Sequence, residues 1–288
     1  MPNAYPSTVT VNVGALSIED VVAVARYGAK VEIAPEALEE VAATRERVEE
    51  LAQDPTPVYG ISTGFGALAR RHIPEEMRAQ LQLSLVRSHA AGTGPEVEEE
   101  VIRALMLLRL STLCTGRTGV RPVVVETYAK ALNAGIVPVV REYGSLGCSG
   151  DLAPLAHCAL ALLGEGEVRV NGELKDASDA LAAAGIEPLQ LREKEGLALI
   201  NGTDGMLGQL CLAITDLRAA AKTADIATAM TVEGLLGTLV VFADDLQQLR
   251  PHPGQADAAA NILQVADGSE ILVAALEEFK KNQVQDAY

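Results

Sequence analysis

The spacing of apolar and polar positions along the 288-residue chain predicts a protein built mainly of helices. Apolar residues recur at intervals of three and four, which is the helical period. Ser17 and Asp20 form a capping-box pattern at the start of the first helix, and Pro35 opens the second, whose charges are expected to face solvent. From Glu193 the pattern is helical almost to the end of the chain. The predicted helices before and within that part are 17–27, 36–53, 75–90, 97–115, 122–133, 152–163, 203–236, 244–250, 255–265 and 268–279.

The predicted β structure is small. Residues 8–13 alternate between Thr, Val and Asn, as in a short strand. Residues 167–177 are centred on Asn171 and Gly172, a dipeptide typical of tight hairpin turns, and predict a small hairpin.

Two segments are predicted to be irregular. Residues 54–66 read DPTPVYGISTGFG, where two prolines and three glycines oppose regular structure. Residues 135–147 are expected to be a connecting loop.

Composition narrows the function classes. Hydrophobic residues make up 49% of the chain but aromatics only 3%, so Ala, Leu and Val must form close-packed helices. A net charge of -16 argues against a nucleic-acid partner, because the phosphate backbone would be repelled.

The start of the chain lacks a signal-peptide pattern, and no run reaches the roughly 18 apolar residues of a membrane span. The cysteines are widely spaced and form no CxxC pair, which is typical of reduced thiols rather than of a disulfide framework. We therefore expect a soluble cytoplasmic protein that does not bind membranes. They are Cys114, Cys148, Cys158 and Cys211.

The most unusual stretch is 144–157, GSLGCSGDLAPLAH. Three glycines flank Cys148 and Ser149, and Asp151 precedes the predicted helix 152–163. Glycine permits backbone conformations and close approaches that other residues do not. The stretch is therefore either a tight loop before a helix or a backbone bent for chemistry.

Several familiar sites are excluded by sequence. The chain has no Walker-type phosphate loop and no GxGxxG, and its histidines lack metal-ligand spacing. A serine hydrolase that uses Ser149 and His157 stays open as an alternative, although GCSG is not the GxSxG of a nucleophile elbow. His157 alone is more often a helix-packing residue. The four histidines are His72, His89, His157 and His252.

Five motifs occur in a characteristic order. They are YGISTGFG at 59–66, RSHAAG at 87–92, GRTGVR at 116–121, the central stretch 144–157, and LINGT at 199–203. In this order they closely resemble the aromatic amino-acid ammonia-lyases, and most of all those that act on histidine. The resemblance covers essentially the whole chain.

The resemblance implies a mainly α, aspartase/fumarase-like helical fold with a small β-hairpin. On this interpretation residues 1–200 form the domain that bears the prosthetic group. Residues 201–288 form the first part of a central helical bundle, which is incomplete in this chain.

The resemblance also implies a self-made electrophile, 4-methylidene-imidazol-5-one (MIO), and no external cofactor or metal. It would form from Cys148, Ser149 and Gly150 when the Gly150 nitrogen attacks the Cys148 carbonyl and two waters leave. Cys replaces the commoner Ala, but only its backbone carbonyl enters the ring. A helix that begins near Asp151 would direct its positive end at the ring. Capture of the substrate's α-amine is favoured over attack on its imidazole, because it leaves the base free for the β-proton.

Residue roles follow from the same resemblance. Tyr59 is the implied general base, although a phenol ordinarily keeps its proton at neutral pH and the alternative is a loop anchor. Asn201 would bind the prosthetic group or substrate, or else cap a helix. Ser88 and His89 match the histidine enzymes, and an imidazole suits an imidazole substrate, the alternative for His89 being a helix end. Tyr288 corresponds to an active-site tyrosine.

The chain departs from the family in length. It ends at Tyr288 within a motif whose later residues include a carboxylate-binding arginine. Family members are longer and assemble as tetramers, whose active sites draw on three subunits. The expected reaction converts L-histidine to trans-urocanate and ammonia.

Several alternatives stay open. One is a related aromatic lyase or aminomutase, and another is a truncated, non-catalytic helical subunit that associates with lyase chains. The expected partners are the small-molecule substrate and either further copies of the chain or a missing C-terminal half. The shortness would reflect a gene product cut short, a fragment, or one of two separately encoded halves.

Overall fold

The computed structural model describes residues 5–147 and 150–282 and divides the chain into two units. The first unit extends to Leu212 and the second begins at Ala213. The functional division expected at residue 200 remains a prediction.

The fold is mainly α, as the sequence predicts, and the helix boundaries agree within a few residues. Within the described residues, α7, which is seven residues long, is the one α-helix in a segment with no predicted helix. The helices of the first unit are α1 (Ile18–Tyr27), α2 (Pro35–Gln53), the 3-10 turn η1 (Gly66–Leu68), α3 (Glu75–His89), α4 (Glu99–Cys114), α5 (Pro122–Asn133), α6 (Leu152–Leu162), α7 (Ala177–Ala183) and α8 (Glu195–Ile200).

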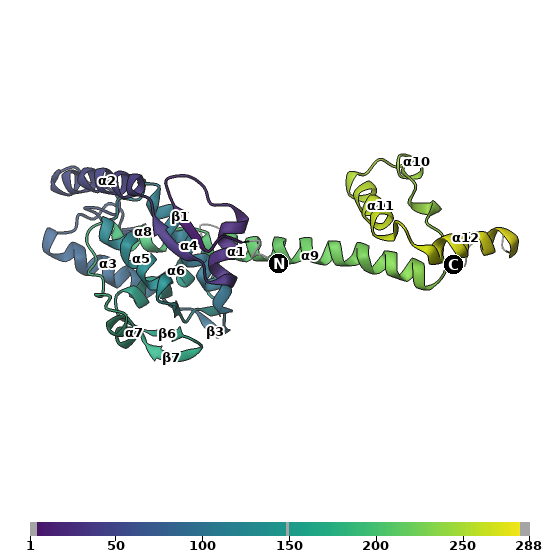
Figure 1. Ribbon diagram of the computed structural model, residues 1–288. Helices are drawn as coiled ribbons and strands as arrows, with labels where there is room; N and C mark the ends of the chain where they lie inside the picture. The colour runs from purple at the N-terminus through teal and green to yellow at the C-terminus, as the bar shows by residue number, and fades with distance from the viewer. Residues whose placement is uncertain (1–4, 148–149, 283–288) are drawn as a thin grey trace. The chain divides into compact units, whose positions relative to one another are not determined.

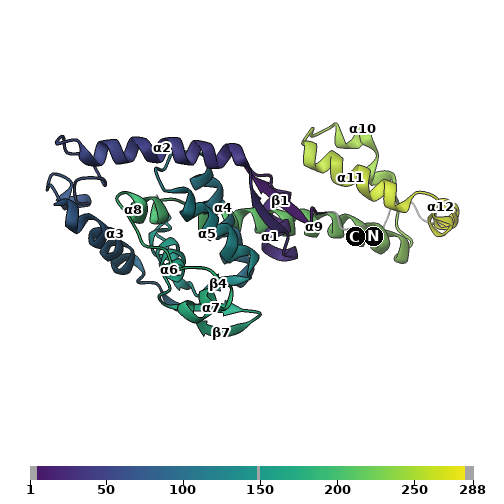
Figure 2. The same ribbon diagram turned by 60° about the vertical axis from the view of Figure 1, so that its left-hand side comes forward.

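Helix α4 forms the centre of the first unit. Ten of its sixteen residues are buried, which fits a helix that is apolar on nearly all sides. It packs against α1, α2 and α5, and α2 runs across α4 and α5 (Figure 2). The loops that carry the sequence motifs connect the helices of this unit.

The predicted capping box at the start of α1 is confirmed. The Asp20 amide donates to the Ser17 hydroxyl at 3.1 Å, and the Asp20 carboxylate accepts from the Ser17 amide at 3.0 Å. Two amide groups that the helix itself leaves unpaired are thereby satisfied.

Short strands are more numerous than predicted. The strand expected at 8–13 is β1 (Thr8–Val11), and it pairs in parallel with β2 (Lys30–Ile33). The segment 135–147 is not only a loop, so that prediction was wrong. It contains β4 (Ile136–Pro138), which pairs with β6 (Glu167–Val170), and β5 (Arg141–Tyr143), which pairs with β3 (Thr93–Glu96). Three residues are too few to show a period, and their extended form depends on partners distant in sequence.

The predicted hairpin is confirmed as β6 (Glu167–Val170) and β7 (Glu173–Asp176), which lie beside α7 (Figure 1). Its two-residue turn has positive φ at both positions, 53° at Asn171 and 79° at Gly172. The turn type that matches strand twist needs positive φ at both residues, which Asn and Gly tolerate best.

Replacing Gly172 by alanine should test this turn. No atom lies within 4 Å of an added Cβ, so the cost is confined to the left-handed backbone. We expect a loss of about 1 kcal/mol in the free energy of unfolding, measured by urea denaturation. Gly14→Ala is the matched control, because that site is equally open and has no positive φ. Equal stability of the two variants would contradict the assignment.

The second unit is entirely helical within its described residues, 213–282. Helix α9 (Asp204–Gly234) begins in the first unit and continues into the second. Its bounds agree with the predicted helix 203–236. It is followed by the 3-10 turn η2 (Val240–Phe242), α10 (Asp244–Gln247), α11 (Pro253–Ala266) and α12 (Glu270–Asn282).

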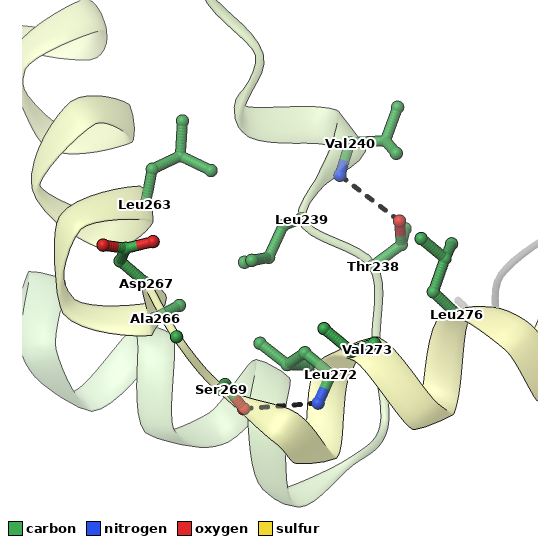
Figure 3. A pocket seen from close by; sticks show the side chains of 12 residues that line it. Thr238, Leu239, Val240, Leu263, Ala266, Asp267, Ser269, Leu272, Val273 and Leu276 are labelled. Atoms are coloured by element: carbon green, nitrogen blue, oxygen red, sulfur yellow. Dashed lines mark hydrogen bonds between the residues drawn. The ribbon is translucent and has the colours of Figure 1, made fainter.

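The second unit has a small core and an open apolar cavity. Its core is formed by Ala229, Ile262, Ala266 and Leu272. A cavity of about 400 Å³ is lined by side chains from 237–240, α11 and α12 (Figure 3). None of the residues that the sequence motifs single out lines it.

None of the helices in the described part of the chain is by itself both long and apolar enough to cross a membrane. Helices α11 and α12 meet that test only as a pair, with a bend of 100° between them.

Candidate active site

Three helices that pack on one another bring the motifs together. Helix α3 ends at His89, α6 begins after Asp151, and α8 ends just before Asn201. Each of these helices contacts the other two. Segments more than a hundred residues apart in sequence therefore meet around the ends of this bundle.

The loop before α6 is joined to the segment after α8. Gly150 and Gly202 form a parallel bridge, in which the Asp151 amide donates to the Gly202 carbonyl at 3.1 Å. On its other side, the Gly150 carbonyl accepts from the Leu146 amide at 2.8 Å. Asn201 immediately precedes the residue that is bridged to Gly150, and its side chain is exposed. Cys148 and Ser149, the other members of the predicted triad, lie outside the described residues, as does Tyr288.

Asp151 anchors this loop. Its carboxylate is 1% exposed and accepts from the Ser145 hydroxyl at 2.7 Å and from the Met206 amide at 2.9 Å. Met206 lies in the first turn of α9, where amide groups lack helical partners. The same carboxylate therefore fixes the glycine loop and caps α9.

The end of α3 presents an imidazole in a defined tautomer. His89 Nδ1 lies 2.8 Å from the Leu85 carbonyl, which accepts but cannot donate, so Nδ1 carries the proton in the neutral ring. Nε2 is then left as an acceptor. Ser88, which is exposed, donates its hydroxyl to the same carbonyl at 2.9 Å.

His157 joins the RSHAAG segment to the central stretch. Its Nε2 accepts from the Gly92 amide at 3.2 Å, and the pKa of His157 is lowered by burial and, to a lesser extent, by the nearby Arg141 charge. The neutral ring is therefore the form that holds this contact. This is a structural use of His157, and it gives no support to a hydrolase in which Nε2 would serve as the base of Ser149.

The His157 contact predicts a pH-dependent stability. Because its pKa in the folded chain lies below the ordinary 6.5, the unfolded chain takes up the proton first as pH falls. Stability should therefore decrease from about pH 7.5 to about pH 5.5. In His157→Gln, whose side chain accepts but does not titrate, the decrease measured by urea denaturation should be smaller. Identical profiles would show that His157 is not responsible.

Tyr59 lies on a loop that is rigid at its base and open at its tip. The Ser62 hydroxyl accepts from the Val58 amide at 3.0 Å, and the Ser62 carbonyl accepts from the Ile73 amide at 2.9 Å. Tyr59 itself is 50% exposed, and its hydroxyl accepts from the Gly66 amide at 3.3 Å. Among the described residues, the polar contact of this hydroxyl is thus within its own loop.

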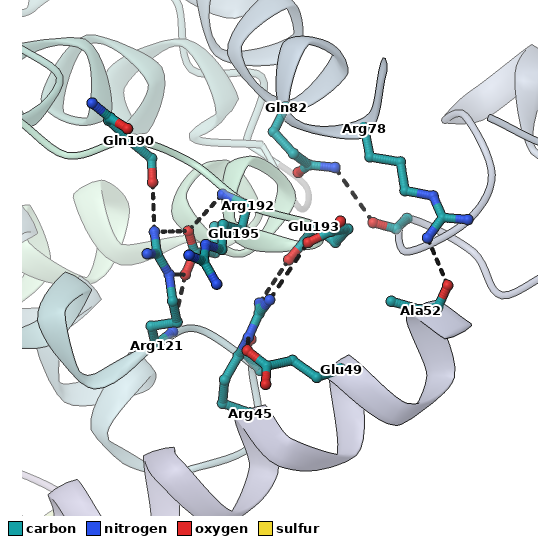
Figure 4. Close-up of polar contacts among 12 residues, drawn as sticks. Arg45, Glu49, Ala52, Arg78, Gln82, Arg121, Gln190, Arg192, Glu193 and Glu195 are labelled. Atoms are coloured by element: carbon teal, nitrogen blue, oxygen red, sulfur yellow. Dashed lines mark hydrogen bonds and ion pairs between the residues drawn. The ribbon is translucent and has the colours of Figure 1, made fainter. Parts of the chain in front are cut away.

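Gln82 connects the Tyr59 loop to the helices, and sequence reasoning missed it. It is 1% exposed, donates to the Gly60 carbonyl at 3.5 Å and accepts from the Leu197 amide at 3.2 Å (Figure 4). One side chain of α3 therefore holds both the Tyr59 loop and the first turn of α8. The available signal was a glutamine on the buried face of a helix.

The GRTGVR motif serves as scaffold. Arg121 donates from its amide and Nε to one oxygen of Glu195, at 3.0 and 2.8 Å, and from Nη2 to the other at 2.8 Å (Figure 4). Arg192 adds its amide at 2.8 Å. These bonds fix the first turn of α8, the helix that leads to Asn201.

Arg45 corrects the expectation that every charge on α2 faces solvent. Its side chain is buried and donates to the Gly119 carbonyl at 3.3 Å and the Glu193 carbonyl at 2.9 Å (Figure 4). It lies buried because α2 packs over the GRTGVR loop and the residues just before α8, whose carbonyls need donors.

Within residues 5–147 and 150–282, no three His, Cys, Asp or Glu side chains are grouped closely enough to hold a metal ion.

Sequence comparison gives a consistent picture. Residues 16–288 match the aromatic amino acid lyase family. The chain is 58% identical over 282 residues to a histidine ammonia-lyase of Streptomyces avermitilis, covering 98% of this chain and 55% of that protein. It is 46% identical to a histidine ammonia-lyase of Gloeobacter violaceus, covering 95% of this chain and 52% of that one. The chain therefore spans about half the length of the curated relatives it matches.

Solved structures of similar fold include enzymes of the same kind. A tyrosine aminomutase from Streptomyces globisporus superposes with a TM-score of 0.86 at 39% identity, covering 97% of this chain and 54% of that chain. A histidine ammonia-lyase from Trypanosoma cruzi superposes with a TM-score of 0.82 at 37% identity, covering 93% and 52%.

Proposed function

This chain belongs to the aromatic amino acid lyase family, and from that premise we propose that the protein eliminates ammonia from L-histidine to give trans-urocanate. The reaction is non-oxidative, and its product retains the imidazole ring. The 58% identity to a protein named histidine ammonia-lyase supports this substrate over other aromatic amino acids.

The observation that carries the proposal is the meeting of three motifs at one place. Asn201 lies beside Gly150 through the Gly150–Gly202 bridge, and the Gly92–His157 contact holds the Ser88–His89 segment beside the same loop. His89 offers Nε2 as an acceptor, which is what the N–H of a neutral substrate imidazole requires.

The described part of the loop is compatible with an MIO group formed from Cys148, Ser149 and Gly150. The Gly150 carbonyl and the Asp151 amide are both held by hydrogen bonds. Among the described residues, no hydrogen bond uses the Gly150 amide, the nitrogen that must close the ring. When formed, the group supplies an electrophile that turns the substrate's amino group into a better leaving group.

The chain's own residues would carry the remaining tasks. Tyr59, as general base, would take the β-proton while the bond from Cα to nitrogen breaks, so that the electron pair of the C–H bond forms the Cα–Cβ double bond and ammonia leaves. Asn201 would orient the substrate or the prosthetic group, and His89 with Ser88 would hold the imidazole. Tyr288 would complete the catalytic set.

We also propose that the active protein is cytoplasmic and oligomeric. The partners would be further copies of the chain, as a tetramer, or a complementary C-terminal half. The exposed side chains of Leu217 and Met230 on α9 favour such assembly, since large apolar groups on a long helix are stabilised by a partner.

The intact mass of the purified chain tests the proposal first. A deficit of two waters that maps to the peptide containing 148–150 would show that the ring forms. Histidine turnover is then assayed with and without a separately expressed C-terminal half of a relative, and phenylalanine and tyrosine serve as control substrates. A β-amino acid product would indicate an aminomutase instead. An unmodified mass together with no turnover in either arrangement would refute the proposal and favour a non-catalytic subunit.

A further inference from the structure

Helix α4 contains one charged residue that is fully enclosed. Arg109 is 1% exposed and pairs with the Asp204 carboxylate, which is also buried, at the first residue of α9. The second oxygen of Asp204 accepts from the Thr112 hydroxyl at 3.1 Å. Removing two charges from water is costly, and a hydrophobic pair of similar volume often stabilises a fold equally well. The pair therefore needs an explanation beyond stability.

A second nitrogen of the guanidinium points at the end of α8. Nη1 donates to the Ala198 carbonyl at 3.0 Å and to the Asn201 carbonyl at 3.2 Å. The last carbonyls of a helix have no partner within it, and here Arg109 supplies one. The backbone of Asn201 is thus fixed from the opposite side of the fold.

The chain passes directly over the ion pair at the next residue. A Cβ on Gly202 would overlap both the Arg109 guanidinium and the Asp204 carboxylate, so a larger residue there would displace the ion pair. The Gly202 carbonyl in turn accepts from the Asp151 amide at 3.1 Å. A continuous series of contacts therefore joins Arg109 to the glycine loop through Asn201 and Gly202.

We propose that Arg109 is the positioning residue that sets Asn201 against the Gly150 loop. Its planar fork holds the Asn201 carbonyl and Asp204 at once, which a lysine cannot do. Asp204 keeps the fork in place, and Gly202 lets the backbone come close enough to be held. The catalytic consequence of this arrangement rests on the proposed function, whereas the structural consequence does not.

Hydrogen exchange tests the structural part on the full chain. The double variant Arg109→Met/Asp204→Leu removes both charges at similar volume, so neither is left unpaired. We expect the amides of Asn201 and Asp151 to exchange at least about 10-fold faster, beyond the change that the shift in thermal midpoint accounts for. Arg103→Met is the matched control. That arginine of the same helix also donates to backbone carbonyls, those of Val24 and Leu132, and should leave both amides unchanged.

Kinetics test the catalytic part. In the active assembly, the double variant should lower kcat by about 100-fold with KM little changed, because misplacement of a catalytic group has effects of that size. Adding the double variant to Asn201→Ala should lower kcat little further, since both act through one group. Arg109→Lys should not restore the rate.

Two results would overturn the inference. One is unchanged exchange at both amides, and the other is wild-type turnover in the charge-free double variant, which would make the pair merely structural. Failure of the proposed function appears elsewhere, as an unmodified and inactive wild-type chain. The exchange measurement would still report the role of Arg109 in that case.

Discussion

The Ser149→Ala variant is expected to retain the full mass calculated from its sequence and to show no histidine turnover. The hydroxyl of Ser149 is the group eliminated when the proposed ring forms, and alanine has nothing to lose at that position. Intact mass spectrometry and an assay for urocanate measure the two effects separately. Since elimination of ammonia without an electrophile is slow, the loss of rate should be complete at the sensitivity of the assay.

Cys148→Ala is the matched control. Only the backbone carbonyl of residue 148 enters the ring, so this variant should still lose two waters and retain activity. Turnover in Ser149→Ala at the wild-type rate would contradict a self-made electrophile. Loss of cyclisation in Cys148→Ala would instead show that the thiol takes part.

Glu195→Ala should produce the largest loss of stability. The Glu195 side chain is fully buried, and its two oxygens accept four hydrogen bonds from Arg121 and the Arg192 amide. Removing it leaves the Arg121 charge and two amides without their acceptor. Breaking a buried ion pair costs about 3–5 kcal/mol. Because Arg121 is partly exposed, we expect the free energy of unfolding to fall by about 3 kcal/mol, the lower end of that range.

Urea denaturation measures this effect, and Glu50→Ala provides the comparison. Glu50 pairs with Arg47 at 2.6 Å, but both side chains are largely exposed. Removal of such a surface pair should change the free energy of unfolding by less than about 1 kcal/mol. Similar losses in the two variants would mean that burial of Glu195 contributes nothing.

Sequence alone predicts the elements that depend on local signals. The start of α1 follows from the Ser17–Asp20 capping box, and the β6–β7 hairpin follows from Asn171 and Gly172. In both cases the residues that determine the structure are within a few positions of one another. Strands β4 and β5 were missed because their conformation depends on pairing with distant segments.

In the candidate site, too, local sequence patterns were predictive and contacts between distant segments were not. The motifs indicate candidate site residues, but not how His89 is oriented or which buried groups support Asn201. The tautomer of His89 depends on the Leu85 carbonyl, a backbone group that no side-chain pattern reveals. Arg109 stands out in sequence as a charge within an apolar helix, yet its partners lie about ninety residues away, at Ala198, Asn201 and Asp204.

The contacts of Asp151 have a consequence for the order of events during protein synthesis. The loop before α6 obtains its final geometry only when Gly202 and Met206 are available to bond with Asp151. At ordinary rates of translation these residues follow Gly150 by roughly 3–10 seconds. A nascent chain that has not reached them lacks both of these contacts of Asp151. Closure of the proposed ring is therefore expected to follow the completion of α8 and the first turn of α9.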